Sequence, residues 1–134
     1  MRVMILLAHG SRREESAQEI KDMAKELSRQ AVENDLFDIV KPAFIQFCGP
    51  DFFQVVDEII KNDLNNDLKQ VAQTEIVVLP YFISAGNHVA EDIPDLVSKA
   101  SAKYPQISFK VTTHLGKFQG LKKLILEESI VSNK

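Results

Sequence analysis

The stretch Val3-Met4-Ile5-Leu6-Leu7-Ala8-His9-Gly10-Ser11-Arg12 sets the fold class, because it joins an apolar run to a glycine turn and a helical pattern. Residues 3–8 contain no polar side chain, which is typical of a strand covered on both faces in a parallel sheet. Ser11 and Glu14 have the spacing of a capping box, so we expect Ser11 to cap the helix that follows. The helix itself is predicted from apolar residues at three- and four-residue steps: Ala17, Ile20, Ala24, Leu27 and Ala31.

The same alternation of strand and helix continues to the end of the chain. Further strands are predicted at residues 37–45, 75–80 and 107–113, although Pro42 weakens the first of these. A second helix is expected from about Asp51, with residues 62–73 as a polar loop or a continuing helix, and residues 81–88 are expected to form a loop. The last two helices are predicted from about Asp92 to Tyr104 and over a final apolar set: Phe118, Leu121, Leu124, Ile125 and Ile130.

This order predicts an α/β fold, a single domain over residues 1–134 with a four-stranded parallel sheet and helices on both faces. Ligands of such sheets bind beyond the carboxyl ends of the strands. We therefore expect the functional residues to lie in the loops that follow the strands.

Composition excludes several classes of partner. The net charge is −3 with the basic residues spread along the chain, so nucleic acid is not an expected partner. No segment approaches the roughly 20 apolar residues that span a bilayer, so a membrane is not expected either. The single cysteine, Cys48, cannot form an internal disulfide, which fits a reducing, cytoplasmic location.

All three histidines of the chain fall at or just beyond the end of a predicted strand: His9, His88 and His114. Two imidazoles from different loops can hold one divalent ion and leave coordination positions open, as transfer of the metal to another ligand requires. For any one histidine taken alone, a capping or loop role is the simpler interpretation. We keep that simpler interpretation for His114.

Other residues near these loops give weaker indications of a functional role. The turn at Gly10 presents free N–H groups, but the chain lacks the glycine-rich nucleotide motifs, so no nucleotide is expected. Cys48 lacks a partner that would make it a nucleophile. Glu91 and Asp92 are expected at a helix start, where carboxylates satisfy free N–H groups, and their closeness to His88 leaves a role in metal capture or proton removal open.

Taken together, these motifs resemble the small CbiX-type chelatases, the sirohydrochlorin cobaltochelatase and ferrochelatase family of class II chelatases. Two segments carry the resemblance: Leu7-Ala8-His9-Gly10-Ser11-Arg12 and the more specific stretch from Val77 to Pro94, with its Gly86-Asn87-His88 and Asp92-Ile93-Pro94. Weaker support comes from Ala43-Phe44 before Pro50 and from Leu115-Gly116.

The resemblance implies a chelatase that inserts a divalent metal into sirohydrochlorin or a related tetrapyrrole without ATP, in cobalamin or siroheme biosynthesis. It implies that His9 and His88 form the catalytic metal site, with Co²⁺ or Fe²⁺ as substrate and Ni²⁺ as a further candidate. It also implies a homodimer. On this hypothesis the tetrapyrrole meets one group of loop residues: Gly10, Ser11, Arg12, Phe82, Ile83, Ser84 and Gly86.

One position departs from the family. Many relatives have a Glu where this chain has Gln46, and a neutral amide cannot accept pyrrole protons as a carboxylate does. Some small members also lack this Glu. Two alternatives therefore stay open: a non-catalytic carrier of metal or tetrapyrrole with the same fold, and a phosphate-binding protein that uses the His9-Gly10-Ser11 turn.

Overall fold

The computed structural model describes residues 1–84 and 86–131, without the side chains of residues 87–90 and 131. Four strands form one sheet, parallel throughout, in the order β2-β1-β3-β4. The strands are β1 (Arg2–Ala8), β2 (Ile39–Phe44), β3 (Glu75–Pro80) and β4 (Ser108–Val111). The predicted α/β class and parallel sheet are confirmed.

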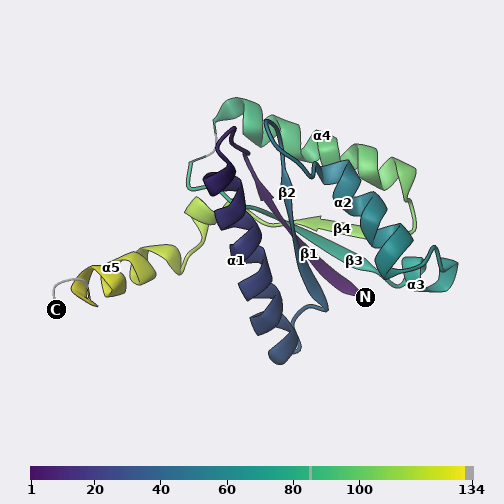
Figure 1. Cartoon of the computed structure of the whole chain (residues 1–134), viewed down its shortest axis with the longest axis horizontal. Coiled ribbons are helices and arrows are strands. Elements are labelled where there is room, and N and C mark those ends of the chain that lie inside the picture. The colour runs from purple at the N-terminus through teal and green to yellow at the C-terminus, as the bar shows by residue number, and fades with distance from the viewer. Residues whose placement is uncertain (85, 132–134) are drawn as a thin grey trace.

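Helices cover both faces of the sheet, and they do so unequally (Figure 1). One face carries α1 (Glu14–Glu33). The other carries α2 (Phe52–Glu58), a π turn η1 (Ile59–Asp63), α3 (Leu68–Ala72) and α4 (Asn87–Lys103). After β4 come the 3₁₀ turn η2 (Leu115–Lys117) and α5 (Leu121–Val131), and α5 extends away from the sheet. No described helix is long and apolar enough to cross a bilayer.

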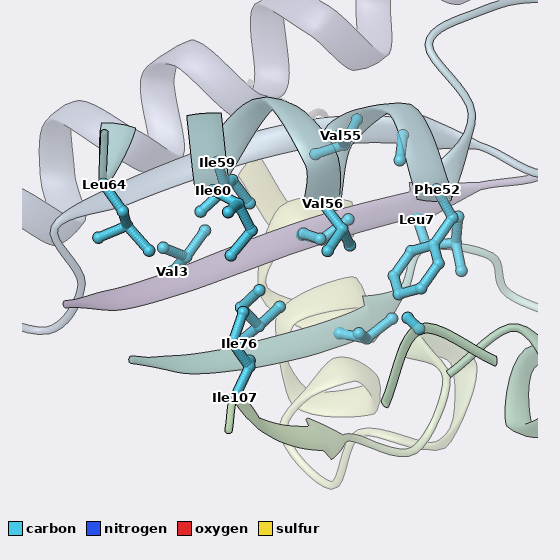
Figure 2. Close-up of a cluster of buried hydrophobic side chains, with 14 of the residues drawn as sticks. Val3, Leu7, Phe52, Val55, Val56, Ile59, Ile60, Leu64, Ile76 and Ile107 are labelled. Carbon is cyan, nitrogen blue, oxygen red and sulfur yellow. The ribbon is translucent and has the colours of Figure 1, made fainter. Parts of the chain in front are cut away.

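The alternation of side chains along β1 divides the core between the two faces. Val3, Ile5 and Leu7 are fully buried in the main cluster with α2, η1 and α4, and Figure 2 shows part of this cluster. Met4 and Leu6 point to the opposite face, where they pack with α1. Truncation of a fully buried Leu or Ile to Ala in such a core costs about 2–5 kcal/mol.

Pro42 lies in β2, which is an edge strand. Proline lacks the N–H that a central strand needs for its second neighbour, so an edge is where a sheet tolerates it. The predicted second strand therefore forms despite its proline. Its bounds are narrower than the predicted 37–45.

The predicted cap at Ser11 is wrong. Helix α1 begins at Glu14 with Arg13 at its N-cap, and no side chain caps it. Gly10 has a φ of +100°, so the chain is still turning at Ser11. The Ser11 hydroxyl instead accepts a hydrogen bond from the N–H of Arg13 at 3.1 Å, closing the turn before the helix.

Helix α4 begins at Asn87, five residues before the predicted start near Asp92. His88 therefore lies in the first turn of a helix and not in a loop. Glu91 and Asp92 lie beyond that first turn, so the prediction that they cap the helix start is wrong. The reason is that Gly86 takes an extended N-cap conformation, and Pro94 is accommodated inside the helix at the loss of one backbone hydrogen bond.

The observed bounds of the remaining helices differ less from the predicted ones. Asp51 caps α2 in a capping box with Gln54, as the turn residues before this helix suggested. The polar stretch after it contains the short helix α3, capped by Asp67. The last helix begins at Leu121, so Phe118 precedes it as the C-cap of η2.

Candidate functional site

The loops that follow the four strands meet at the carboxyl edge of the sheet and are joined in pairs by backbone hydrogen bonds. The N–H of Gln46, after β2, donates to the carbonyl of His9, after β1, at 3.1 Å. The N–H of Gly116, after β4, donates to the carbonyl of Phe82, after β3, at 3.2 Å. Each bond holds a residue of the predicted site against the neighbouring loop.

Gly10 is required by the first of these pairs. Its φ of +100° lies in the region that only glycine adopts readily. A Cβ on Gly10 would lie 1.7 Å from the carbonyl oxygen of Gln46. The main chain of position 46 thus fixes the turn that carries His9, while the Gln46 side chain is exposed.

Gly116 plays the same part in the second pair. A Cβ there would lie 1.7 Å from the carbonyl oxygen of Ile83. The loop after β4 therefore packs directly against the backbone of the loop that carries Phe82. This close approach gives a physical role to the Leu115-Gly116 pair noted in the sequence.

Three aromatic rings join the two pairs of loops. The ring of Phe82 lies between the imidazoles of His9 and His114, with centroids 5.7 Å from each. Phe82 and His114 stack at an interplanar angle of 21°, whereas His9 and Phe82 are tilted by 55°. All three side chains are half-buried, so the rings form a continuous wall that remains accessible from solvent.

His9 borders a cavity of about 250 Å³ between the end of β1 and the first turns of α1. Apolar carbon and hydroxyl groups make up most of its lining, and Glu19 is the acidic member. The lining residues are Ala8, His9, Gly10, Ser11, Ser16, Ala17, Glu19, Ile20, Phe44 and Tyr81. Such a recess offers an imidazole beside an apolar wall.

A second hollow, of about 440 Å³, shares Ser11 with the first and is basic. Arg12, Arg13 and Lys21 line it, and Glu14 is the acidic residue among its walls. The guanidinium of Arg12 lies 4.9 Å from the ring centroid of Phe47. This cation–π contact orients the exposed Arg12, which lines the hollow and can pair with a carboxylate.

Of the two histidines predicted to bind metal, the structure describes the side chain of His9 alone. His9 lies at the carboxyl edge of the sheet, where the strand-end rule predicted it. His88 follows the loop of Phe82 in the first turn of α4, but its side chain lies outside the described residues. Among the side chains that are described, no three His, Cys, Asp or Glu gather to hold an ion. His114, which the sequence left as a loop residue, is brought to the same ring wall as His9.

The remaining predicted residues lie around this wall. Ile83 and Ser84 are exposed on the loop after β3, as is Gly86, and Ala85 lies outside the described residues. Glu91 and Asp92 are exposed on α4, whereas Ile93 between them and Pro94 is buried in the main cluster. The half-buried Cys48 lines the basic hollow.

Two site residues were missed from the sequence. Tyr81 lines the cavity at His9, and the N–H of Tyr81 donates to the carbonyl of Leu7 at 2.7 Å. The strand-end rule that selected His9 would also have found Tyr81, because both directly follow buried strands. Phe47 has a φ of +72°, a conformation that its residue type does not signal, so no sequence feature pointed to its contact with Arg12.

The comparisons with known proteins all point to one family. The CbiX family model matches residues 3–130. The chain is 32% identical over 113 residues to the chloroplastic sirohydrochlorin ferrochelatase of Arabidopsis thaliana, covering 84% of this chain and 44% of that protein. It is 27% identical over 97 residues to the sirohydrochlorin cobaltochelatase of Methanococcus aeolicus, covering 72% and 59%.

Solved structures match in fold at low sequence identity. A CbiX protein from Marinobacter aquaeolei aligns over 100% of both chains with a TM-score of 0.68 and 20% identity. The sirohydrochlorin chelatase SirB from Bacillus subtilis, in complex with cobalt, aligns with a TM-score of 0.67 and 20% identity, covering 94% of this chain and 48% of that one. The chain spans about half the length of the curated relatives it matches. Since the family model covers nearly all of the sequence, the chain belongs to the CbiX family.

Proposed function

We propose that this protein inserts a divalent metal into sirohydrochlorin or a related tetrapyrrole, without a nucleotide, in cobalamin or siroheme biosynthesis. The observation that carries the proposal is the position of His9, at the end of β1, against Phe82 and beside an apolar cavity. The relatives named sirohydrochlorin ferrochelatase and cobaltochelatase support the substrate class.

The metal is a substrate in this scheme. His9 and His88 bind Co²⁺ or Fe²⁺, or Ni²⁺, through neutral imidazole nitrogens and leave positions open for the pyrrole nitrogens. The start of α4 at Asn87 supports this pairing, because it ties His88 to the same loop that places Phe82 against His9.

The macrocycle lies against the ring wall. Phe82 and Ile83 offer apolar surface to its face, and the loop through Ser84 and Gly86 borders it. The acidic side chains of the substrate meet Arg12, Ser11 and the N–H groups after Gly10, at the basic hollow. The contact of Arg12 with Phe47 supports this part, because it holds the guanidinium in place before substrate arrives.

Metalation releases two pyrrole protons for each ion inserted. Imidazole exchanges protons near neutral pH, so His9 and His88 can accept them after the metal leaves. Glu91 and Asp92 are alternative acceptors, since both carboxylates are exposed on the helix that carries His88. The proposal also includes a homodimer and a cytoplasmic setting, the latter because one cysteine leaves no internal disulfide to form.

The test is a metalation assay on the purified protein with sirohydrochlorin and Co²⁺ or Fe²⁺, followed by absorbance. We expect insertion well above the spontaneous rate, and a His9→Ala, His88→Ala double variant that falls to that rate. Lys99→Ala, an exposed change elsewhere on α4, is the matched control and should retain full activity. Binding of the tetrapyrrole with no acceleration by the unaltered protein would instead identify a carrier, the role that Gln46 leaves open.

A further inference from the structure

Phe47 has a backbone conformation that its side chain disfavours. Its φ of +72° lies in the left-handed region, where a bulky side chain is strained. The other non-glycine residues with positive φ in the described chain are Asp35, Asn65 and Asn66, whose short polar side chains tolerate this region. A Gly or an Asn would therefore fit the place of Phe47 in its loop at a lower conformational cost.

Burial does not account for a phenylalanine at this position. The side chain of Phe47 is 56% exposed, and it belongs to none of the buried apolar clusters of the described residues. Apolar side chains stabilise a fold in proportion to the area that they remove from water. The strain at Phe47 is therefore not offset by contact with the core.

The loop around Phe47 is fixed by backbone hydrogen bonds. The N–H of Phe44 donates to the carbonyl of Pro50 at 2.9 Å, which closes the loop. The N–H of Gln46 donates to the carbonyl of His9 at 3.1 Å, and Phe47 directly follows this bond. The positive φ of Phe47 thus belongs to a loop that is bound to the turn carrying His9.

The ring of Phe47 contacts a charged side chain. The guanidinium carbon of Arg12 lies 4.9 Å from the ring centroid. Arg12 is exposed, and no ion pair among the described residues involves it. The aromatic ring therefore limits the positions of a side chain that otherwise has many rotamers, and the N–H donors of the guanidinium stay available to a carboxylate.

The basic hollow around this pair favours an anion. Arg12, Arg13 and Lys21 line it opposite a single carboxylate, that of Glu14, and Phe47 lines it as well. Within the part of the chain that the structure describes, none of these charged side chains forms an ion pair. The excess of positive charge attracts a carboxylate-bearing ligand to the place where the ring meets Arg12.

We propose that Phe47 is a positioning residue for the substrate. Its ring holds the guanidinium of Arg12 in the orientation that pairs with a carboxylate of the tetrapyrrole, and this contact is the reason that a strained phenylalanine stands in the loop. The inference rests on the proposed function, whose substrate it assumes. It adds a residue that acts through Arg12 on the affinity for the tetrapyrrole and leaves metal transfer unchanged.

Three variants separate the ring from the strain. Phe47→Tyr keeps both, Phe47→Leu keeps the strain without the ring, and Phe47→Asn removes both. The KM for sirohydrochlorin should rise roughly two- to fivefold in the two variants without the ring, the range of a cation–π contact at an exposed site, and stay unchanged in Phe47→Tyr. The kcat should stay within about twofold of the unaltered value in all three, because an effect on substrate affinity alone leaves kcat unchanged.

Stability distinguishes positioning from a structural role. Phe47→Asn should unfold at the same or a higher denaturant concentration than the unaltered protein, because Asn adopts a positive φ at lower cost. Its KM should nevertheless rise. Asp35→Gly is the matched control, since it relieves a φ of +54° outside the hollow and should leave the KM unchanged.

Two results would overturn the proposal in this series. A KM that is unchanged in Phe47→Leu would show that the ring does not act on the substrate. A KM that rises in Phe47→Asn alone would follow the backbone conformation and not the ring. If Phe47→Asn does not fold, Phe47→Leu decides the outcome by a raised or an unchanged KM.

A double-mutant cycle with Arg12 tests how the ring acts. Arg12→Ala should itself raise the KM, and Phe47→Leu should add nothing in that background, because the ring acts through the guanidinium. An undiminished effect of Phe47→Leu in the Arg12→Ala protein would mean that the ring contacts the macrocycle directly. That result overturns the proposal.

Fluorescence titration of sirohydrochlorin into the protein, without metal, separates this inference from the proposed function. The dissociation constant should change across the variants in the same order as the KM. Binding that weakens when the ring is lost, with no acceleration of metalation by the unaltered protein, refutes the proposed function alone. Metalation with a KM and a dissociation constant that do not respond to loss of the ring refutes the inference alone, and a protein that binds no tetrapyrrole refutes both.

Discussion

The rings of His9 and Phe82 lie 5.7 Å apart, centroid to centroid, although they belong to loops that follow different strands, β1 and β3. Phe82 also stacks on His114, which belongs to the loop after β4. Backbone hydrogen bonds between the loops, from Gln46 to His9 and from Gly116 to Phe82, support this arrangement. The position of His9 therefore depends on how the loop after β2 packs against the turn at Gly10.

Gly116→Ala should destabilise the protein by about 1–3 kcal/mol, because the new Cβ would meet the carbonyl of Ile83. Metalation should fall as Phe82 is displaced with its loop. Gly120→Ala is the matched control, since nothing lies within 4 Å of its Cβ, and it should leave stability unchanged or slightly increased. Denaturant melts of both variants measure the difference, and equal midpoints would show that the loop contact is unimportant.

His9→Ala should weaken Co²⁺ binding at least tenfold, as loss of a ligand does. His114→Ala should leave the metal affinity within about threefold and act through the stacking on Phe82, worth roughly 1 kcal/mol. Calorimetric titration with Co²⁺ checks both. Equal losses of affinity in the two variants would place His114 among the metal ligands and contradict its role as a wall residue.

Tyr104→Phe should lower stability by about 1–2 kcal/mol at neutral pH, because Asp57 then loses the hydrogen bond from the Tyr104 hydroxyl. That bond, with help from Lys103, lowers the pKa of Asp57 below its usual value. Its stabilisation is complete above the ordinary carboxyl pKa and is lost as the pH falls through the lower pKa of folded Asp57. The difference between the two proteins should therefore shrink below about pH 4; a constant difference would exclude this linkage.

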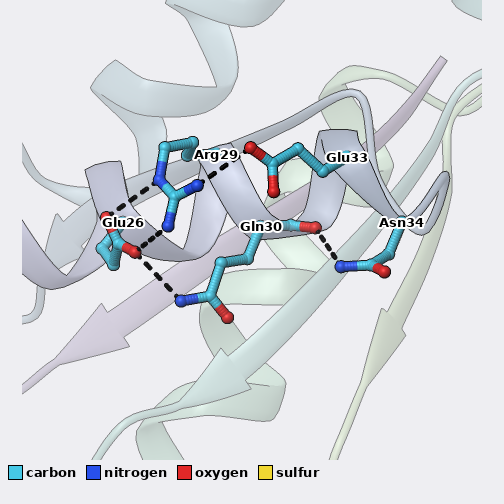
Figure 3. A network of polar contacts seen from close by, with 5 residues as sticks. All are labelled: Glu26, Arg29, Gln30, Glu33 and Asn34. Atoms are coloured by element: carbon cyan, nitrogen blue, oxygen red, sulfur yellow. Dashed lines mark hydrogen bonds and ion pairs between the residues drawn. The ribbon is translucent and has the colours of Figure 1, made fainter.

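Arg29→Ala should raise the pKa of Glu26 toward the ordinary value of 4.5. In the folded protein the hydrogen bonds from Arg29, and then from Gln30, lower the pKa of Glu26 to about 2 (Figure 3). Carboxyl chemical shifts followed through an acid titration measure this directly. Since the network is fully exposed, thermal stability should hardly change at neutral pH, and Gln30→Ala should shift the pKa in the same direction by less.

Much of this architecture was predictable because it follows from burial. The uninterrupted apolar run at residues 3–8 predicted a strand covered on both faces, and the apolar residues after Glu75 predicted a further strand; both strands form. The strand-end rule then predicted that His9 lies at the carboxyl edge of the sheet, where the structure has it. These features depend on short apolar runs and on the residues that directly follow them, and both can be identified in the sequence.

The start of α4 and the cap of α1 were not predictable for a different reason. Pro94 favours a helix start nearby, but Gly86 begins the helix earlier and the fold accepts Pro94 in its interior. Ser11 has a capping residue's spacing, yet the left-handed turn at Gly10 leaves it outside the helix. For Ser11, the turn at Gly10 therefore overrides a local capping preference.

The stacking of His114 on Phe82 depends on the strand order β2-β1-β3-β4, which makes β3 and β4 neighbours. A linear pattern predicts four strands and does not order them. Likewise, the contact of Arg12 with Phe47 depends on a positive φ at a phenylalanine. Only the assembled fold shows these pairings.

The proline in the edge strand has a consequence for how molecules of this protein can associate. Pro42 removes one amide donor from the outermost strand, and the opposite border, β4, offers only Ser108–Val111. Neither border is a good template for a foreign strand, so ribbon-like polymerisation through backbone pairing is disfavoured. Even at high concentration, molecules of this protein are therefore protected against growth into fibres by edge-to-edge pairing.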